Sequence, residues 1–509
     1  MPAIMSDYDV LIVAQSPGGW AAAVTLAQAG RKVALLDQVR VNPGSMIPRG
    51  GVLLQVFPAL EQRIKREDQL FQVVAPAHRF SIPPGYNRFL SELGLEFPEL
   101  KDEFDPILAR VQDSGRATSD YFRIWGIERR RPDYRTLDGK LFENLSLWRH
   151  YQRVRHLNLA DLDQRLSRSP SLCRILESPG RFSSAAFWDK EAEGMGAFSA
   201  YYRQAFFPLF SPLEAKAGLV GLGEVMTVLR RIAREMKVEV LNPAAADLPD
   251  DGNPGPREGK WRFEFSTRRQ IKKATAFHLW EIKGEEKKVF FRSLIWSGNG
   301  PEFLRSLSEG MRKSRGARLL SRHLETLEAR YFLEALEIKV KAEVIPVGME
   351  KRVFYLGKTD QEPADENLIY LEILPLQEAE PGTEEGGAGY PRESGNLLIQ
   401  AAFMRSASKS AEEVSGRVFR RVCGLVPFLK EFLVGEPVLK KREELAEDGS
   451  PVWQNRRGLN SGKLTVPVGK AGIYYSGREL LPALGFEADL LSGLVTAWSL
   501  EKWLRKISK

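Results

Sequence analysis

The sequence has few residues of the kinds that build disulfide frameworks, metal centres or membrane spans. Its 2 cysteines, Cys173 and Cys423, lie far apart, which argues against a disulfide scaffold or a thiolate metal site. Its 5 histidines show no metal-ligand spacing. The sequence contains no run of about 18 apolar residues and no secretory signal pattern at its N-terminus. We therefore expect no bound metal, no transmembrane segment and a cytoplasmic location.

The charge of the chain does not identify a nucleic-acid-binding protein. The formal net charge is +8, but basic residues are scattered among acidic ones and no nucleic-acid-binding module is visible. A solvated basic surface is the simpler interpretation, and peripheral contact with an anionic membrane is the alternative. The aromatic and arginine-rich stretch from Phe142 to Leu159 leaves two interpretations open. It is a core helix with a charged outer face, or an amphipathic cap that meets an apolar substrate or a membrane.

The first residues have the pattern of a βαβ unit. The apolar run from Asp9 to Val13 predicts a buried strand, and a turn follows at Gln15 to Gly19. Apolar residues at helical spacing from Trp20 to Ala29 then predict a helix, and Lys32 to Leu36 predicts a second strand that ends at Asp37. Because strands joined by a helical crossover run parallel, we expect these two strands to form a parallel pair.

Further elements are predicted along the rest of the chain. The expected helices are Leu141 to Leu159, Gly221 to Met236 and Leu490 to Leu504. The expected strands are an antiparallel meander (Trp261 to Ser266, Ala276 to Ile282, Lys287 to Trp296), a pair (Leu368 to Leu374, Asn396 to Phe403) and two short runs (238–241, Gly472 to Tyr475). The acidic and glycine-rich segment from Gln377 to Gly395 is then the long tip of a hairpin.

In this order the segments resemble the phytoene desaturase and amine oxidase superfamily of FAD-dependent oxidoreductases. The opening strand and the run Ala14-Gln15-Ser16-Pro17-Gly18-Gly19 resemble its FAD fingerprint, and the segment from Gly472 to Gly477 resembles its C-terminal flavin-contact segment. The resemblance runs nearly end to end, and the middle matches least. The implied fold is also similar to that of the Rab GDP-dissociation inhibitors, and the run Gly221-Leu222-Gly223-Glu224 is similar to a segment of those proteins.

The resemblance implies an α/β fold, with a Rossmann-like FAD/NAD(P)-binding domain and an inserted α+β substrate-type domain. Residues 1–80 are expected to form the first part of the dinucleotide-binding domain, and residues 81–215 a helical substrate or cap region. Residues 216–310 are the second part of the dinucleotide-binding domain with the meander. Residues 311–460 are the substrate-type domain, and residues 461–509 return to the dinucleotide-binding domain.

The resemblance also assigns candidate FAD-binding positions, several of which are altered. In the fingerprint the first glycine permits a tight turn, the second lets the pyrophosphate approach the helix N-terminus, and the third packs helix on strand. Here these positions hold Ala14, Ser16 and Gly19, so only the packing glycine is kept. The further candidates are Asp37 for the adenosine ribose, Gly44 in the next glycine-rich loop, and Gly477 with Arg478 near the flavin.

Three further positions are altered, one in the glycine-rich loop after the second strand and two near the C-terminus. Ser45 stands in place of a second loop glycine, Ala488 replaces a common glycine, and Arg478 stands where the family usually has an acid. This cation either reverses the electrostatics of the site or pairs with a phosphate. Alteration at both ends of the cofactor predicts that FAD binding is lost or reshaped, and no catalytic residue can be assigned.

Two functions from different classes remain open. The leading one is an FAD-dependent oxidoreductase that transfers hydride to or from an apolar isoprenoid, polyene or lipid-like molecule. The alternative is a flavin-free pseudoenzyme that acts as a binding or scaffold protein for an apolar ligand or a partner protein. The Rab GDP-dissociation inhibitors, which hold prenylated partners, are a precedent for the second function. One fold hosts many activities, so the fold alone does not decide between them.

Overall fold

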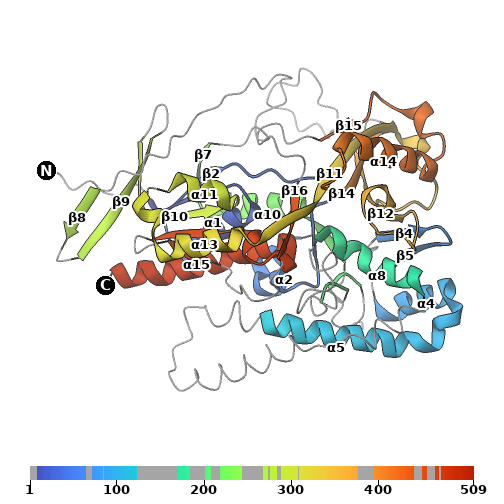
Figure 1. Ribbon diagram of the computed structural model, residues 1–509, viewed down its shortest axis with the longest axis horizontal. Coiled ribbons are helices and arrows are strands. Elements are labelled where there is room, and N and C mark those ends of the chain that lie inside the picture. Colours follow the sequence, from blue (N-terminus) through green and yellow to red (C-terminus); the bar gives the residue numbers. More distant parts are fainter. Residues whose placement is uncertain are drawn as a thin grey trace.

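The computed structural model describes most of the chain (Figure 1). The described residues are 8–64, 71–83, 85–122, 169–183, 201–203, 205–207, 218–242, 268–272, 275–283, 288–307, 309–376, 395–440, 450–455, 465–468 and 472–508. The expected helix from Leu141 to Leu159, the wider stretch from Phe142 and the expected strand from Trp261 to Ser266 lie outside these residues. Among the described residues, no helix is both long and apolar enough to cross a membrane.

The first sheet is built around the N-terminal βαβ unit. Strand β1 (Tyr8–Ala14) pairs in parallel with β2 (Val33–Asp37), and helix α1 (Pro17–Gln28) connects them, as the sequence predicts. Both strands are almost completely buried, which explains their continuous apolar runs. The helix begins at Pro17 rather than at Trp20, because a proline in the first turn loses no helical hydrogen bond.

Segments from three parts of the chain complete this sheet, whose main order is β17-β18-β10-β1-β2-β7. The added strands are β7 (Glu239–Asn242), β8 (Arg268–Lys272), β9 (Thr275–Lys283), β10 (Lys288–Ser297), β17 (Val466–Val468) and β18 (Ile473–Ser476). Strands β8, β9 and β10 pair antiparallel in sequence order, and β9 and β10 cover the expected runs Ala276 to Ile282 and Lys287 to Trp296. The N-terminal, middle and C-terminal segments thus share one Rossmann-like sheet.

The second sheet has the order β15-β11-β14-β13-β12-β4-β5, with β16 also paired to β11. Its strands are β4 (Phe71–Ala75), β5 (His78–Ile82), β11 (Leu327–Lys341), β12 (Arg352–Leu356), β13 (Leu368–Pro375), β14 (Asn396–Ser406), β15 (Val438–Leu439) and β16 (Ser450–Asn455). Strands β13 and β14 pair antiparallel on either side of the expected hairpin tip. The expected domain boundary at residue 80 falls inside β5, and β4 pairs with β12 of the second sheet.

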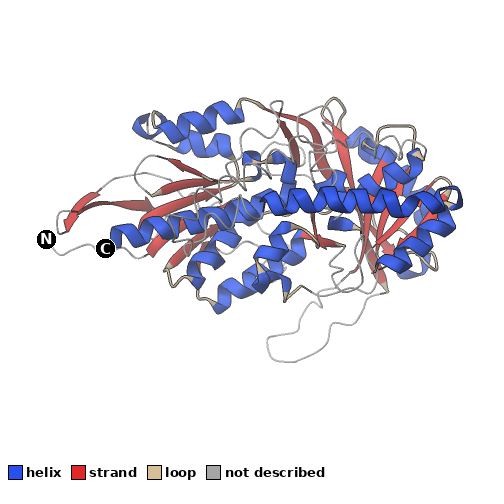
Figure 2. Ribbon diagram, turned by 90° about the horizontal axis from the view of Figure 1, so that it is seen from below, coloured by secondary structure: helices blue, strands red, loops and turns tan. Residues whose placement is uncertain are grey.

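Helices cover the two sheets, which lie toward opposite ends of the long axis (Figure 2). The longer helices are α4 (Tyr86–Glu96), α5 (Phe104–Phe122), α8 (Pro170–Ser183), α10 (Leu222–Glu235), α13 (Arg315–Leu324), α14 (Ala411–Leu425) and α15 (Gly485–Ser508). The shorter ones are α2 (Val52–Val56), α3 (Pro58–Glu61), α11 (Gly300–Ser306) and α12 (Glu309–Arg312). Strands β3 (Met46–Pro48) and β6 (Leu219–Gly221) form a separate antiparallel pair.

Helices α1 and α15 pack directly against each other, and this contact sets the geometry of the candidate site. A Cβ atom added at Gly493 of α15 would overlap the carbonyl group of Gly18, and one added at Gly18 would overlap the carbonyl oxygen of Asp489. Glycine at both positions therefore lets the two backbones approach closely. Helix α15 starts at Gly485, earlier than expected, so its first turn reaches the N-terminus of α1.

Candidate functional site

The N-terminus of α1 is the place where the fingerprint would receive a pyrophosphate. Gly19 packs this helix on β1, since a Cβ atom added there would lie 2.5 Å from the Cβ of Ala14. Ser16 is the N-cap residue, with an extended backbone at φ −141°. Pro17 follows it, so the first turn of the helix lacks one of the backbone N–H groups that could bind an anion.

The side chain of Ser16 is bonded to two other parts of the protein. Its hydroxyl donates to Oδ1 of Asp489 at 2.7 Å and lies 2.8 Å from the hydroxyl of Ser297, at the end of β10. Asp489 belongs to the first turns of α15 and is 3% exposed. Burial raises the pKa of Asp489 from 3.8 to about 7, while the bond from Ser16 and the charge of Arg478 oppose the rise. A carboxyl group therefore lies at the N-terminus of α1, hydrogen-bonded to the middle fingerprint position.

The turn before α1 is also held by internal contacts. The side-chain oxygen of Gln15 accepts from the indole of Trp296 and from the backbone N–H of Asn299, both at 3.1 Å. Its amide nitrogen donates to Glu302 at 2.8 Å. Gly298 has φ +135° and packs against the Cβ of Gln15, which leaves no room for a side chain there. The loops after β1 and β10 are thus joined through Gln15.

Asp37, the candidate ribose ligand, lies buried at the end of β2. Its Oδ1 accepts from the indole of Trp20 at 3.1 Å and from the backbone N–H of Val39 at 3.0 Å. Its Oδ2 forms an ion pair with Arg230 of α10 at 3.0 Å. Arg230 also lies over the ring of Trp20. Both carboxylate oxygens therefore already have donors from the protein itself.

Gly44 lies in the loop after β2 and has φ +77°, a conformation that favours glycine. A Cβ atom added there would overlap the Cβ of Ala402 in β14, so this loop lies directly on the second sheet. Ser45 is buried and its carbonyl accepts from the backbone N–H of Leu222. The run Gly221-Leu222-Gly223-Glu224 forms the junction of β6 and α10, which gives it a structural role.

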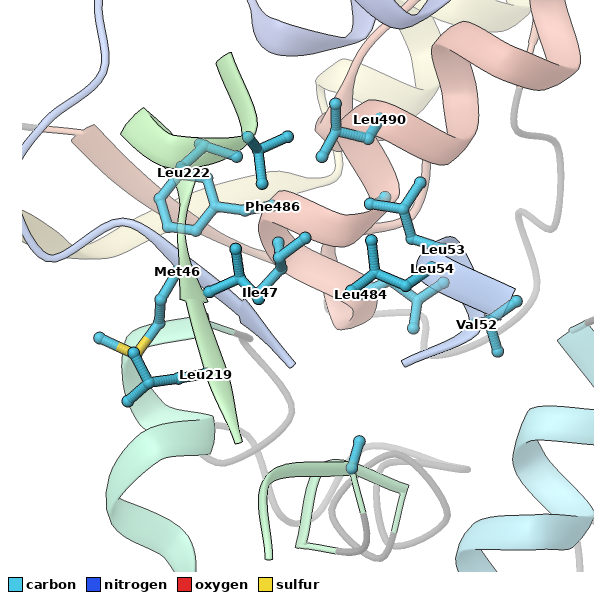
Figure 3. Close-up of a cluster of buried hydrophobic side chains, with 14 of the residues drawn as sticks. Met46, Ile47, Val52, Leu53, Leu54, Leu219, Leu222, Leu484, Phe486 and Leu490 are labelled. Atoms are coloured by element: carbon cyan, nitrogen blue, oxygen red, sulfur yellow. The ribbon is translucent and has the colours of Figure 1, made fainter. Parts of the chain in front are cut away.

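Apolar side chains fill the space between this loop and the start of α15 (Figure 3). Side chains from β3 and α2 lie against side chains from residues 484–490, and β6 and α10 contribute others. The labelled members are Met46, Ile47, Val52, Leu53, Leu54, Leu219, Leu222, Leu484, Phe486 and Leu490. All are buried, and Phe486, at 8%, is the most exposed of them. These contacts form one part of a continuous hydrophobic core.

A second buried carboxyl group lies beside this cluster. Glu487 accepts from the backbone N–H of Leu53 at 2.7 Å and from the hydroxyl of Tyr201 at 2.6 Å. The Tyr201 hydroxyl in turn accepts from the N–H of Val52 at 2.8 Å, so this pair satisfies the first N–H groups of α2. Burial raises the pKa of Glu487 from 4.5 to about 7.

Gly477 and Arg478 lie where β18 leads into α15. The backbone N–H of Gly477 donates to the hydroxyl of Ser492 at 3.0 Å, and Gly477 packs against Tyr475 and Glu479. The guanidinium of Arg478 lies over the ring of Phe486, 5.1 Å from its centroid. Its positive charge also lowers the pKa values of Asp489 and Glu479, opposing the effect of their burial. Arg478 therefore faces acidic groups of the chain itself.

Comparison with solved structures identifies the architecture. A triple mutant of putrescine oxidase with redesigned cofactor binding is similar in structure to this chain. The alignment covers 99% of each of the two chains, with a TM-score of 0.50 and 13% sequence identity. A double mutant of the same enzyme covers 97% and 98%, again with a TM-score of 0.50 at 13% identity. The chain has the fold of putrescine oxidase. No protein-family model matches the sequence, and a search of curated proteins finds no relative.

The putrescine oxidase fold confirms the expected α/β architecture and the fold part of the sequence resemblance. A Rab GDI from Plasmodium falciparum is also similar, covering 92% of this chain and 93% of its own at 9% identity, but its TM-score of 0.45 is too low to support an inference. At these identities the comparisons establish the fold alone. The roles of the candidate residues remain predictions, which the geometry of the site must support.

The residues present do not fit FAD in the manner of the fingerprint. A bound pyrophosphate needs free backbone N–H groups and close approach at the N-terminus of α1. The carboxyl group of Asp489 lies there, bonded to the hydroxyl of Ser16, and an ionised carboxylate repels phosphate. Asp37 accepts from Trp20, Val39 and Arg230. The side chains at the phosphate end and at the ribose end of the predicted site are therefore both bonded within the protein.

Several of these residues were not singled out by sequence reasoning. Asp489 and Glu487 could have been noticed, because two acids within an otherwise apolar segment imply buried partners. Pro17 could also have been noticed, since proline removes an N–H donor from the fingerprint itself. The contacts of Gln15 with Trp296 and of Asp37 with Arg230 have no local sequence signal, because they join segments more than 190 residues apart.

Proposed function

We propose that this chain is a flavin-free protein on the putrescine oxidase fold, and that it acts as a binding or scaffold protein. The observation that carries the proposal is the buried carboxyl group of Asp489, which is hydrogen-bonded to Ser16 at the N-terminus of α1. In an FAD-binding member this position would receive a phosphate, which the ionised form of the carboxyl group would repel. The ligand would be an apolar small molecule or lipid, or a partner protein, and contact would be in solution or at a membrane surface.

The proposal is also supported by the hydrogen bonds that the candidate FAD-binding side chains form with other residues of the chain. Asp37 and Ser16 each have partners within the chain, at distances typical of formed hydrogen bonds. FAD would have to displace these contacts and leave buried polar groups without partners, at a cost of about 1–3 kcal/mol for each group. The sequence-based preference for an oxidoreductase remains a prediction, and the same experiment tests it.

The test is the visible absorption spectrum of the freshly purified protein, followed by denaturation and assay of released flavin. We expect a colourless protein that releases no flavin and takes up no added FAD. A matched variant, Ala14→Gly/Ser16→Gly/Asp489→Ala, removes the side chains from the phosphate position and is expected to gain measurable FAD affinity. A flavin band near stoichiometric with the unaltered protein would refute the proposal and make the oxidoreductase the working model.

A further inference from the structure

Basic side chains gather on the helices α11, α12 and α13, which follow β10 in the chain. Helices α11 and α13 contact each other on the outside of the first sheet (Figure 1). Residues 300–324 contain six basic and two acidic side chains, a net charge of +4, whereas the whole chain of 509 residues carries +8. This short segment therefore holds a surplus of positive charge equal to half of the total. Its basic residues, all of them exposed, are Arg305, Arg312, Lys313, Arg315, Arg318 and Arg322.

Helix α13 presents a basic face to the solvent. Its buried residues Ala317 and Leu320 belong to the hydrophobic cluster on one face of the first sheet, so the opposite side of the helix points outward. Arg315, Arg318 and Arg322 follow one another at intervals of three and four residues, which places them along one side of a helix. All three are exposed, and together they form the outer arginine face of α13.

Contacts at both ends of α13 hold this face in a fixed orientation. Ser314 caps the N-terminus of the helix by accepting from a backbone N–H of the first turn at 3.3 Å. A Cβ atom added at Gly316 would overlap the carbonyl oxygen of Pro467 in β17, so the helix lies directly on that strand. In the last turn the ring of His323 donates to the backbone carbonyl of Glu479 at 2.6 Å. The arginines are therefore carried on a rigid part of the fold.

Nearby acidic side chains leave the outer arginine face uncompensated. Glu309 pairs with Lys313 at 2.6 Å. Glu302 accepts from the amide of Gln15 at 2.8 Å, and Glu325 accepts from a serine hydroxyl of α13 at 3.0 Å. The three outer arginines form no ion pair with any carboxylate in the part of the chain that the structure describes. Their positive charge is therefore available to an anionic partner.

An apolar side chain lies among these arginines. Leu319 is 43% exposed, and it is four residues from Arg315 and three from Arg322, on the same side of the helix. Arginine side chains pack their apolar stems on a surface and extend their charged ends beyond it. Basic groups beside an exposed apolar group suit a bilayer, which offers anionic headgroups above an apolar layer. A nucleic-acid backbone offers the negative charge without an apolar layer beneath it.

We propose that the outer arginine face of α13, extended by Arg305 and Arg312, is a docking surface for an anionic lipid membrane. The guanidiniums bind the phosphate and carboxylate groups of the lipid headgroups. Leu319 reaches below the headgroups. The inference goes beyond the proposed function by naming both the surface and its partner, and it holds whether or not the protein takes up FAD.

The experiment measures binding of the full-length protein to vesicles by cosedimentation. One set of vesicles is phosphatidylcholine alone, and the other is an equimolar mixture of phosphatidylserine and phosphatidylcholine. We expect binding to the mixed vesicles only. It should be lost when the ionic strength rises from about 0.1 to about 1 M, because the Debye length falls from about 10 to about 3 Å. Equal binding to both sets, binding that persists at high salt, or no binding would overturn the inference.

A triple variant then tests the location of the surface. Each basic side chain near an anionic bilayer contributes about a fivefold gain in affinity. Arg315→Gln/Arg318→Gln/Arg322→Gln should therefore raise the Kd for the mixed vesicles about a hundredfold. The matched control, Arg420→Gln/Arg421→Gln/Lys430→Gln, removes the same charge from exposed positions beside the second sheet and should leave the Kd nearly unchanged. An equal loss of binding in the two variants would refute the assignment to α13.

A further variant and a second probe distinguish a membrane from a nucleic acid. Leu319→Ser keeps the charge of the surface, and it should still weaken vesicle binding several-fold because less apolar surface enters the bilayer. Duplex DNA, the second probe, should bind more weakly than the mixed vesicles. Tighter binding to DNA than to vesicles would overturn the membrane assignment, as would a vesicle Kd that Leu319→Ser leaves unchanged.

Discussion

Replacing Asp489 by asparagine tests the energetic cost of the carboxyl group at the N-terminus of α1. Burial raises the pKa of Asp489 from 3.8 to about 7 in the folded protein. The unfolded chain therefore releases this proton at lower pH than the folded protein does, and stability falls as the pH rises from about 4 to 7. A shift of this size corresponds to about 4 kcal/mol. Asparagine keeps an acceptor for Ser16 but cannot ionise.

We therefore expect Asp489→Asn to stabilise the protein above pH 7 by up to about 4 kcal/mol, and to reduce the slope of stability between pH 4 and 7 by about 1.4 kcal/mol per pH unit. For 509 residues the unfolding entropy is about 1 kcal/mol/K, so the Tm at pH 8 should rise by up to about 4 °C. Scanning calorimetry from pH 4 to 8 measures both effects, and Asp9→Asn, at a partly exposed carboxylate, is the control. The reasoning is refuted if Asp489→Asn lowers the Tm at pH 8 or leaves the pH slope unchanged.

Three further changes test other contacts of the site by calorimetry. Glu487→Gln should flatten the same pH range, because burial raises the pKa of Glu487 from 4.5 to about 7, and an unchanged profile would contradict this. Gly493→Ala should cost about 1–3 kcal/mol by forcing α15 away from Gly18, so an unaltered Tm would mean that the helices separate freely. Arg230→Met should cost about 1–3 kcal/mol because it removes the cation paired with buried Asp37, and wild-type stability would show that the other donors suffice.

The first sheet could be predicted from sequence because its signals are local. The apolar runs around Val10 and Val33 predict strands buried on both faces, and the crossover between them requires a parallel pair. The second sheet was harder to delimit. Strands β4 and β5 follow the first βαβ unit in the chain and pair with each other, but β4 also pairs with β12, 281 residues later. No periodicity within residues 71–82 specifies which sheet they join.

The candidate site shows a different limit of sequence reasoning. Ala14 and Ser16 could be recognised as altered because the fingerprint assigns each position a physical role. The contact between Asp489 and Ser16 could not be predicted, because the two residues are 473 positions apart in the sequence and meet only when α15 packs on α1. Asp37 shows the same limit. An acid at the end of the second strand is typical of a ribose ligand, but no local signal predicts that Trp20 and Arg230 bind its carboxylate in the folded protein.

The contacts of Ser16 with Asp489 and of Asp37 with Arg230 suggest how the fold could remain stable without a cofactor. In an FAD-dependent member the cofactor would satisfy the N-terminus of α1 and the acid at the end of β2, so its loss would leave both unsatisfied. Here Arg230 pairs with Asp37, and Asp489 accepts from the hydroxyl of Ser16 at the N-cap of α1, where Gly18 and Gly493 let α15 approach closely. Both contacts come from helices of the fold itself. Under the proposed flavin-free function, contacts within the chain would hold both places without a cofactor, and the fold of putrescine oxidase would be kept while the function changes.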